Sequence, residues 1–314
     1  MTMKFWSLAF CVVLICSGAG AQSAAWQPGA GHEQVPIWPE AAPDARPAKG
    51  AERAVKEGGT VAGRPVTTVH YVSRPTMTVY SPKEKNTGAA LVVFPGGGFS
   101  VLAIDLEGSE VCEWMAARGI TCVLLKYRVP DSGPYSDAGK QRYPAAPLAL
   151  EDAQRTVRLV RFHAGEYHID PHKIGVLGFS AGGYLAADIS TNYEKRTYAE
   201  KSEADRVSCR PDFAVVMYPG HLQASHDGVT LNSRIAVTRQ TPPTFLLQNE
   251  DDHVDSINDA LVYYIALKNA GVPVEFHSYT QGGHGFGLRR TQLAVTGWPE
   301  LVETWLRGLG MIER

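Results

Sequence analysis

From residue 66 onward, apolar runs rich in β-branched residues alternate with stretches of helical periodicity, and this alternation constrains the fold more than any other feature. We expect strands at residues 89–94, 121–127, 173–179, 213–218, 244–248 and 274–279, after an opening antiparallel pair at 67–72 and 76–80. Helices are expected at residues 108–118, 148–163, 181–190, 256–270 and 298–309. Strands that alternate with crossover helices are typical of a largely parallel sheet with helices on its faces. The sequence therefore predicts one α/β domain.

The first residues have the pattern of a secretory signal peptide. Lys4 supplies a positive charge, residues 5–16 are apolar apart from one serine, and Ala19-Gly20-Ala21 is a small-x-small cleavage sequence. The apolar run is shorter than the roughly 20 residues that span a bilayer, so we expect no stable membrane anchor. The predicted organisation is a signal peptide at residues 1–21, an extended arm with tryptophan anchors at 22–65, and the α/β domain at 66–314. A secreted or periplasmic location would follow.

The charge balance and the cysteines restrict the possible partners and cross-links. The chain has 30 Lys and Arg against 32 Asp and Glu, a formal charge of -2, and it lacks the basic excess that a nucleic-acid partner requires. Of its 5 Cys, Cys11 and Cys16 would leave with the signal peptide, so the rest allow at most one disulfide. We expect Cys112 and Cys122, in a predicted helix and a buried strand, to be free core thiols. Cys209 has no obvious partner.

A candidate nucleophile follows the predicted strand 173–179. Ligands of parallel sheets bind past the carboxyl ends of the strands, and this strand runs into Gly178-Phe179-Ser180-Ala181-Gly182, a G-x-S-x-G sequence before a helix. The glycines permit a tight turn that exposes the Ser180 hydroxyl, and the following helix directs the Ala181 amide at the same point. A glycine-rich turn with an N-capping serine is the structural alternative. The strand before and the helix after favour a nucleophile.

A serine hydroxyl needs a base to take its proton, and His284 is the candidate. It lies in the glycine-rich loop 282–287, directly after the predicted strand 274–279. Neighbouring glycines permit a loop that reaches over the edge of the sheet. We therefore expect His284 to approach Ser180.

The base needs a carboxylate to orient it, and four acids follow the predicted strand 244–248. Most of these acids are expected to be solvated or helix-capping groups, because the next helix begins directly after them. They are Glu250, Asp251, Asp252 and Asp255. Asp252 lies far enough past the strand to turn back toward the histidine loop and is preferred, with Asp251 as the alternative. The resulting order of serine, aspartate and histidine is that of α/β-hydrolases.

A glycine run predicts the donors for an oxyanion. Pro95-Gly96-Gly97-Gly98-Phe99 follows the early strand 89–94, where backbone amides without side chains can face a ligand closely. Gly97 or Gly98, together with Ala181, would form the oxyanion hole, and a flexible glycine turn is the alternative. His168 and His172 lack a third ligand, so we expect no metal there. We also expect no other cofactor.

Together these motifs resemble those of the α/β-hydrolase esterases. The resemblance is strongest to the bacterial branch described as feruloyl-esterase-like or acetyl-xylan-esterase-like, which is more distantly related to the hormone-sensitive-lipase group. It covers about residues 66–310 and rests on spaced motifs at residues 95–99, 103–108, 178–183, 252–254 and 282–286. It implies the α/β-hydrolase fold and Asp252 as the acid. Gln248 and Asn249 replace the family's usual His-Gly, which leaves Asp251 open, and Pro95 stands where many relatives have His.

The resemblance implies a metal-free serine carboxylic ester hydrolase that acts through an acyl-enzyme. Acetyl esters of carbohydrate, such as xylan or xylo-oligosaccharides, or other short-chain acyl esters are the expected substrates. An exported peptidase or amidase of the same fold is one alternative, because the triad does not distinguish esters from amides. A non-catalytic binding module is a second, although such a module has no reason to keep a complete triad.

Glu107 has two interpretations. It follows the glycine loop closely, so it would orient that loop or contact a sugar hydroxyl. A charge favoured at a helix N-terminus is the plainer interpretation and the preferred one.

Overall fold

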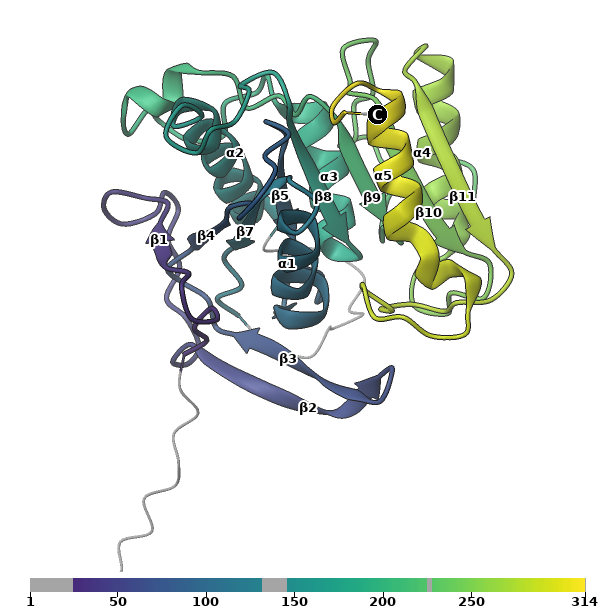
Figure 1. Ribbon diagram of the computed structural model, residues 1–314, viewed down its shortest axis with the longest axis horizontal. Coiled ribbons are helices and arrows are strands. Elements are labelled where there is room, and N and C mark those ends of the chain that lie inside the picture. Colours follow the sequence, from purple (N-terminus) through teal and green to yellow (C-terminus); the bar gives the residue numbers. More distant parts are fainter. Residues whose placement is uncertain (1–24, 132–145, 225–227, 314) are drawn as a thin grey trace, which may run out of the picture.

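The computed structural model describes residues 25–131, 146–224 and 228–313 (Figure 1). The predicted signal peptide at residues 1–21 lies outside them. An eight-stranded sheet of order β1-β4-β7-β5-β8-β9-β10-β11 forms the centre of the described chain. Its strands are β1 (Gln34–Pro36), β4 (Thr76–Tyr80), β5 (Ala90–Phe94), β7 (Thr121–Lys126), β8 (Ile174–Phe179), β9 (Ala214–Met217), β10 (Thr244–Asn249) and β11 (Val274–Tyr279).

Most of this sheet is parallel. β7, β5, β8, β9, β10 and β11 pair in parallel, whereas β4 and β1 join antiparallel at one edge. Every residue of β5, β7, β8, β9 and β10 is buried, as expected for strands that are covered on both faces. The predicted α/β class is therefore confirmed.

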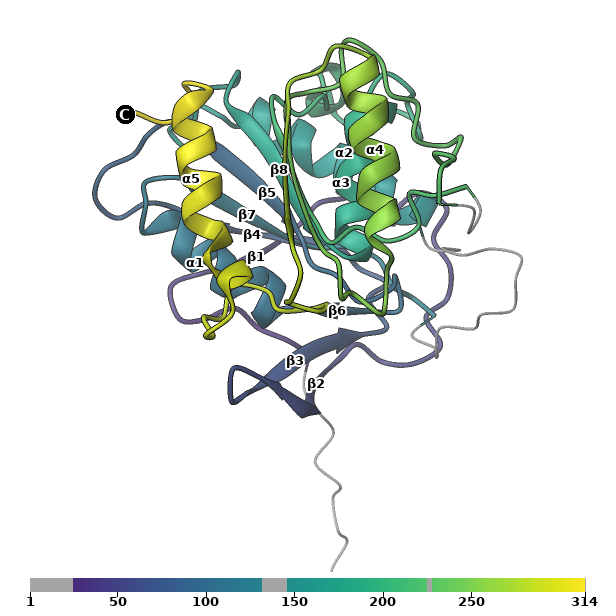
Figure 2. The ribbon, with the colours of Figure 1, turned by 90° about the vertical axis from the view of Figure 1, so that its right-hand side faces the viewer.

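Helices cover both faces of the sheet. Figure 2 shows α1 and α5 on one face, and α2, α3 and α4 on the other. Their bounds are α1 (Glu110–Ala116), α2 (Ala146–Phe162), α3 (Ala181–Asn192), α4 (Ile257–Asn269) and α5 (Trp298–Gly308). This arrangement leaves the carboxyl ends of the parallel strands free at one edge, where the candidate active-site residues lie.

A small second sheet corrects one predicted strand pairing. The runs at 67–72 and 76–80 do not pair with each other: β3 (Arg64–His70) pairs with β2 (Arg53–Val61) and β6 (Val101–Ala103), while β4 joins the main sheet. Tyr71 adopts a positive φ of 58°, which ends β3 and turns the chain toward the main sheet. The strand pattern of each run was visible in the sequence, but the turn between them was not.

The segment predicted as an extended arm contains two strands, β1 and β2. Most positions of β2 are exposed, so the apolar alternation that marks a half-buried strand is absent. The expected tryptophan anchor is present at Trp38, which is buried and donates from Nε1 to Asp152 Oδ1 at 2.8 Å. Asp152 also accepts from the buried Arg128 guanidinium and amide, so the arm bonds to a carboxylate of α2 that is itself held in a buried ion pair.

Cys112 and Cys122 form a disulfide, so the expectation that both are free core thiols is wrong. Cys112 lies on α1 and Cys122 on β7, and α1 leads into β7 through a short turn and packs against it. Their Cα atoms are 5.0 Å apart, within the range that a disulfide spans. The sequence places Cys112 in a helix and Cys122 in a strand, but it does not show that these two elements pack against each other. Cys209 is buried and free.

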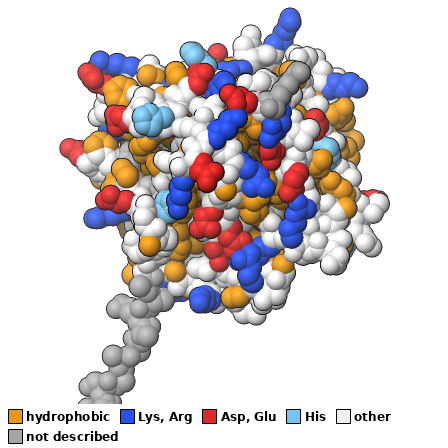
Figure 3. All heavy atoms as spheres, in the orientation of Figure 1, with side chains coloured by type: hydrophobic (Ala, Val, Ile, Leu, Met, Phe, Trp, Pro, Cys, Tyr) orange, Lys and Arg blue, Asp and Glu red, His pale blue; other side chains and the backbone are white. Residues whose placement is uncertain are grey.

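The surface carries charges of both signs. On the face shown in Figure 3, acidic and basic side chains lie interspersed with apolar ones, in line with the small net charge of -2. Among the helices that the structure describes, none is long and apolar enough to cross a membrane.

Replacing both Cys112 and Cys122 by alanine should lower the free energy of unfolding by about 2 to 3 kcal/mol, because the disulfide closes a short loop in the unfolded chain. Chemical denaturation of wild type and double variant measures the difference. A reducing agent should destabilise the wild type by a similar amount and leave the double variant unchanged. Equal stability of the two proteins under oxidising conditions would contradict the disulfide.

Candidate active site

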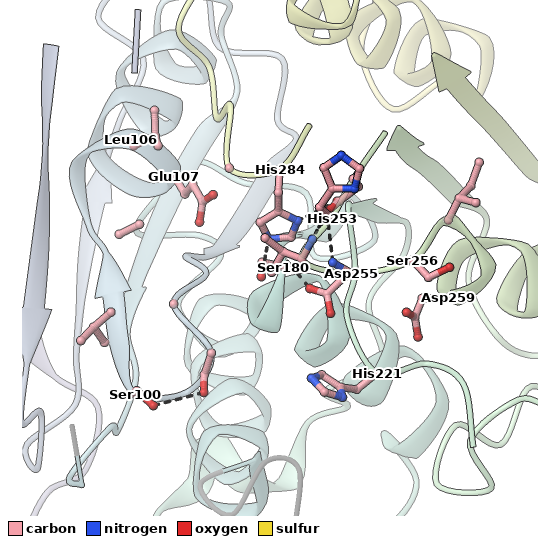
Figure 4. Close-up of a pocket in the computed structure, with 18 of the residues that line it drawn as sticks. Ser100, Leu106, Glu107, Ser180, His221, His253, Asp255, Ser256, Asp259 and His284 are labelled. Carbon is pink, nitrogen blue, oxygen red and sulfur yellow. Dashed lines mark hydrogen bonds and ion pairs between the residues drawn. The ribbon is translucent and has the colours of Figure 1, made fainter. Parts of the chain in front are cut away.

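A cavity of about 1020 Å³ opens at the carboxyl ends of the parallel strands (Figure 4). Segments far apart in the sequence meet in its wall. Gly97 and Gly98 follow β5, Ser180 follows β8, Asp252 follows β10, and His284 follows β11. The sheet therefore brings the residues predicted from separate motifs to one place.

Ser180 occupies a sharp turn between β8 and α3. Its backbone has φ 53° and ψ -118°, a left-handed conformation that is strained for a residue with a side chain. The turn is close-packed: a Cβ on Gly178 would overlap the carbonyl oxygen of Gly182, and a Cβ on Gly182 would overlap that of Phe94. The glycines of G-x-S-x-G are thus required by close contact, since neither of them has a positive φ.

His284 links Ser180 to Asp252. Its Nε2 lies 2.9 Å from Ser180 Oγ, and its Nδ1 lies 2.7 Å from Asp252 Oδ2. With the ring proton on Nδ1 donated to the carboxylate, Nε2 is free to accept the proton of the serine hydroxyl. The Tyr218 ring packs edge-on against the imidazole, with centroids 4.9 Å apart. This arrangement has the geometry of an activated nucleophile.

The structure brings Asp252, rather than Asp251, to His284. The Oδ1 atom of Asp252 accepts from the amides of Val254 (2.9 Å) and Asp255 (3.0 Å), which hold the carboxylate in place. Asp251 instead accepts from the amides of Gly282 and Gly283 and so supports the base of the histidine loop. The Gly283 amide contributes most to holding the pKa of the Asp251 carboxyl below its usual range.

The two residues that depart from the family's His-Gly both support this site. Gln248 Nε2 donates to Asp252 Oδ2 at 3.0 Å and to the Asp255 carbonyl at 2.9 Å. Asn249 Nδ2 donates to the Gly283 carbonyl at 2.9 Å. Gln248 therefore holds the acid loop, and Asn249 ties the end of β10 to the histidine loop.

Three carboxylates control the charge state of His284. Burial by itself lowers the pKa of the imidazole, but the hydrogen bond to Asp252 and the negative charges of Asp252, Asp255 and Glu107 outweigh it, so the pKa lies above the ordinary 6.5. The site therefore favours the imidazolium that forms when His284 takes the serine proton.

The amides predicted to bind an oxyanion lie on the glycine loop and at the start of α3. Gly97 and Gly98 line the cavity with φ of 129° and 61°, conformations that glycine adopts without strain. The amides of Gly97, Gly98 and Ala181 form no hydrogen bond with another described residue. The Gly96 amide, by contrast, donates to Glu107 Oε2 at 2.8 Å. Gly97 and Gly98 thus lie at the cavity wall with unbonded amides, and an oxyanion hole formed by them with Ala181 stays a prediction.

Glu107 lies in the first turn of the π-helical turn η1 (Asp105–Ser109), as the plainer interpretation expects, but its side chain is buried beneath the glycine loop. Besides the Gly96 amide it accepts from the Tyr218 hydroxyl at 2.7 Å. The same hydroxyl accepts from the Gly287 amide at 3.2 Å. Glu107 and Tyr218 therefore connect the glycine loop to the histidine loop. Apart from its place at the end of a predicted strand, no sequence pattern marks Tyr218 as part of the site.

Asp255 was expected to be a solvated or capping acid, and the structure places it elsewhere. Ser256 provides the cap of α4, accepting from the Asn258 amide, whereas Asp255 is directed into the cavity. Its Oδ2 lies 3.9 Å from His284 Nε2 (Figure 4). The run of acids in the sequence indicated charge at this point but not which acid faces the histidine.

Comparison with known families agrees with these features. The BD-FAE family model matches residues 77–218, which include the glycine loop and the Ser180 turn. The acetylxylan esterase of Xylanibacter ruminicola is 28% identical over 227 residues, which are 65% of this chain and 42% of that protein. The chain thus spans less than half the length of this curated relative.

Solved structures give a wider match. The acetyl ester-xyloside bifunctional hydrolase from Caldicellulosiruptor lactoaceticus is 31% identical with a TM-score of 0.67, covering 89% of this chain and 97% of that one. A thermophilic esterase from Thermogutta terrifontis is 24% identical with a TM-score of 0.63, covering 76% of this chain and 91% of its own. The second match supports the α/β-hydrolase fold alone.

The acid limb of the pH profile of kcat/KM should have its midpoint above pH 6.5, because His284 must be neutral to accept a proton and its pKa is raised. Glu107→Gln removes a nearby negative charge, so this midpoint should move to lower pH. The plateau should also fall about 10-fold, because the Gly96 amide loses a charged acceptor. Hydrolysis of p-nitrophenyl acetate across pH measures both effects.

Tyr218→Phe is the matched control. It removes the hydroxyl from the same network but keeps the charge of Glu107, so the plateau should fall while the midpoint stays near that of the wild type. A Glu107→Gln variant with the plateau and midpoint of the wild type would show that Glu107 plays no part in the site.

Proposed function

Since the chain belongs to the BD-FAE family of α/β-hydrolase esterases, we propose that this serine carboxylic ester hydrolase removes acetyl groups from xylan or xylo-oligosaccharides. The observation that carries the proposal is the hydrogen-bonded series of Asp252, His284 and Ser180 at the wall of the cavity. A nucleophile, a base and an orienting acid are the groups that acyl transfer requires.

Each residue has one role in the proposed reaction. Ser180 Oγ attacks the acetyl carbonyl and gives its proton to His284 Nε2, while Asp252 stabilises the imidazolium. The amides of Gly97 or Gly98 and of Ala181 stabilise the oxyanion. His284 then protonates the leaving alcohol, which departs and leaves acetyl-Ser180. A water molecule that gives a proton to His284 attacks this ester, and acetate leaves as Ser180 recovers its proton.

The cavity suits a polar alcohol portion. Its wall carries polar side chains beyond the three triad residues, among them His221, Gln223, His253, Ser256 and Asp259. Hydroxyl-rich rings are bound through such groups, whereas a long acyl chain would need an apolar channel. Relatives named for acetylxylan and for acetyl ester and xyloside hydrolysis support carbohydrate acetyl esters as substrates.

We also propose that the protein acts outside the cytoplasm, secreted or in the periplasm. The signal-peptide pattern of residues 1–21 is the basis of this proposal. The disulfide between Cys112 and Cys122 supports it, because disulfides persist in oxidising compartments.

Ser180→Ala should lower kcat for p-nitrophenyl acetate by about 10⁴-fold or more, because it removes the nucleophile. The same variant should release no acetate from acetylated xylo-oligosaccharides, which the wild type deacetylates. Ser208→Ala, at an exposed position outside the cavity, is the matched control and should retain wild-type rates. Equal rates for Ser180→Ala and wild type would refute the mechanism. A wild type that cleaves p-nitrophenyl acetate but not the acetylated oligosaccharides would be a general short-chain esterase.

A further inference from the structure

A second carboxylate faces the catalytic histidine from the substrate side. Asp252 contacts Nδ1 of His284, whereas Asp255 Oδ2 lies 3.9 Å from Nε2, the nitrogen that also faces Ser180. The Asp255 side chain is only 10% exposed and lines the cavity. Its carboxylate accepts no hydrogen bond from the residues that the structure describes. The proposed reaction as described above gives Asp255 no role.

The surrounding backbone holds this carboxylate in position. The Asp255 amide donates to Asp252 Oδ1 at 3.0 Å, and its carbonyl accepts from Gln248 Nε2 at 2.9 Å. The carboxylate fits against Gly220, where a Cβ would lie within 2.6 Å of both carboxylate oxygens. The same residues that orient the triad acid therefore also direct Asp255 toward His284.

The position of the Asp255 carboxylate relative to His284 Nε2 indicates which part of a substrate it can contact. His284 Nε2 returns its proton to the leaving alcohol, so the oxygen of that alcohol must lie within about 3 Å of Nε2. In a substrate placed in this way, the carbon atoms next to the ester oxygen would lie beside the Asp255 carboxylate, which is 3.9 Å from the same nitrogen. A hydroxyl on the neighbouring carbon would be within reach of it. Sugars have such a vicinal hydroxyl, and simple alcohols do not.

Burial without a donor is unfavourable for a carboxylate, and a substrate hydroxyl would relieve it. Burial raises the pKa of Asp255 to about 7, assisted by the charges of Asp259 and Asp252 and opposed by His284. A hydroxyl donated by the substrate would therefore satisfy a group that the protein alone leaves without a donor.

We propose that Asp255 is a specificity-determining residue that accepts a hydrogen bond from the hydroxyl vicinal to the scissile ester. The pocket would thereby select acetyl esters of vicinal diols, such as those on sugar rings, over acetyl esters of simple alcohols. This inference rests on the proposed function, because it requires His284 to serve the leaving alcohol.

A matched pair of small esters tests the inference. The compounds trans-2-hydroxycyclohexyl acetate and cyclohexyl acetate differ only by the vicinal hydroxyl. The ratio of their kcat/KM values should be about 10 or more in the wild type, the range expected for a hydrogen bond to a charged group. In Asp255→Ala the ratio should fall to about 1, and Asp255→Asn should keep part of it because its amide oxygen still accepts.

The ratio separates specificity from folding and from the chemical step. Both esters meet the same enzyme, so a loss of folded protein or a change in His284 affects both values equally. Glu250→Ala, which removes an exposed carboxylate from the same loop and cavity, is the control and should keep the wild-type ratio.

The outcomes distinguish the two proposals. Equal kcat/KM values for the two esters in the wild type, or an unchanged ratio in Asp255→Ala, would overturn the role of Asp255 while leaving the esterase mechanism intact. If the wild type hydrolyses neither these esters nor p-nitrophenyl acetate, the proposed function fails, and the role of Asp255 fails with it.

Discussion

His284 is held by two hydrogen bonds, one at each ring nitrogen, and much of the fold keeps it there. The parallel order β8-β9-β10-β11 places the ends of the three strands that precede Ser180, Asp252 and His284 at one edge of the sheet. Residues separated by 104 positions in the chain thereby come within hydrogen-bonding distance. A parallel sheet of buried strands is rigid enough to hold such a geometry, because both of its faces are packed against helices.

Electrostatic support for the histidine comes from carboxylates that are themselves buried. Burying a carboxylate is unfavourable unless hydrogen-bond donors surround it, and the carboxylates of this site receive different numbers of donors. Asp252 receives donors from Gln248 and two amides, and Glu107 receives the Gly96 amide and the Tyr218 hydroxyl. These bonds also join the glycine loop, the acid loop and the histidine loop into one network. Asp252 and Glu107, whose charges raise the pKa of His284, are therefore also groups through which these loops are joined.

Local sequence patterns predicted much of this molecule, and contacts between distant segments account for the rest. Apolar strand runs and helical periodicity located the parallel strands to within a few residues, because buried strands must be apolar on both faces. The G-x-S-x-G turn and the position of the histidine after β11 identified the residues that the sheet brings together. The pairing of β3 with β2, the disulfide and the place of Glu107 were not predictable in this way. Each depends on which elements pack together, and no local pattern specifies that.

The acid residues show this limit most clearly. Four carboxylates follow β10, and Asp252 was preferred among them for its distance from the end of the strand. Only the folded structure shows that Asp251 binds the Gly282 and Gly283 amides and that Asp255 faces the cavity. The amino-acid composition and the charge of the loop are the same whichever acid faces the histidine, so neither identifies that acid. Assignment of the acids therefore needed the direction of each side chain, which the main-chain hydrogen bonds of the loop determine.

The most direct test of the central interaction compares Asp252→Asn with Asp251→Asn. Both variants remove one negative charge from the same loop, and kcat for p-nitrophenyl acetate is measured for each, with circular dichroism to verify folding. Asp252→Asn should lower kcat by about 10⁴-fold, because an amide cannot hold the imidazole in the required tautomer, whereas Asp251→Asn should retain most of the activity. A similar loss in Asp251→Asn, or near wild-type activity in Asp252→Asn, would contradict the assignment of Asp252 as the partner of His284.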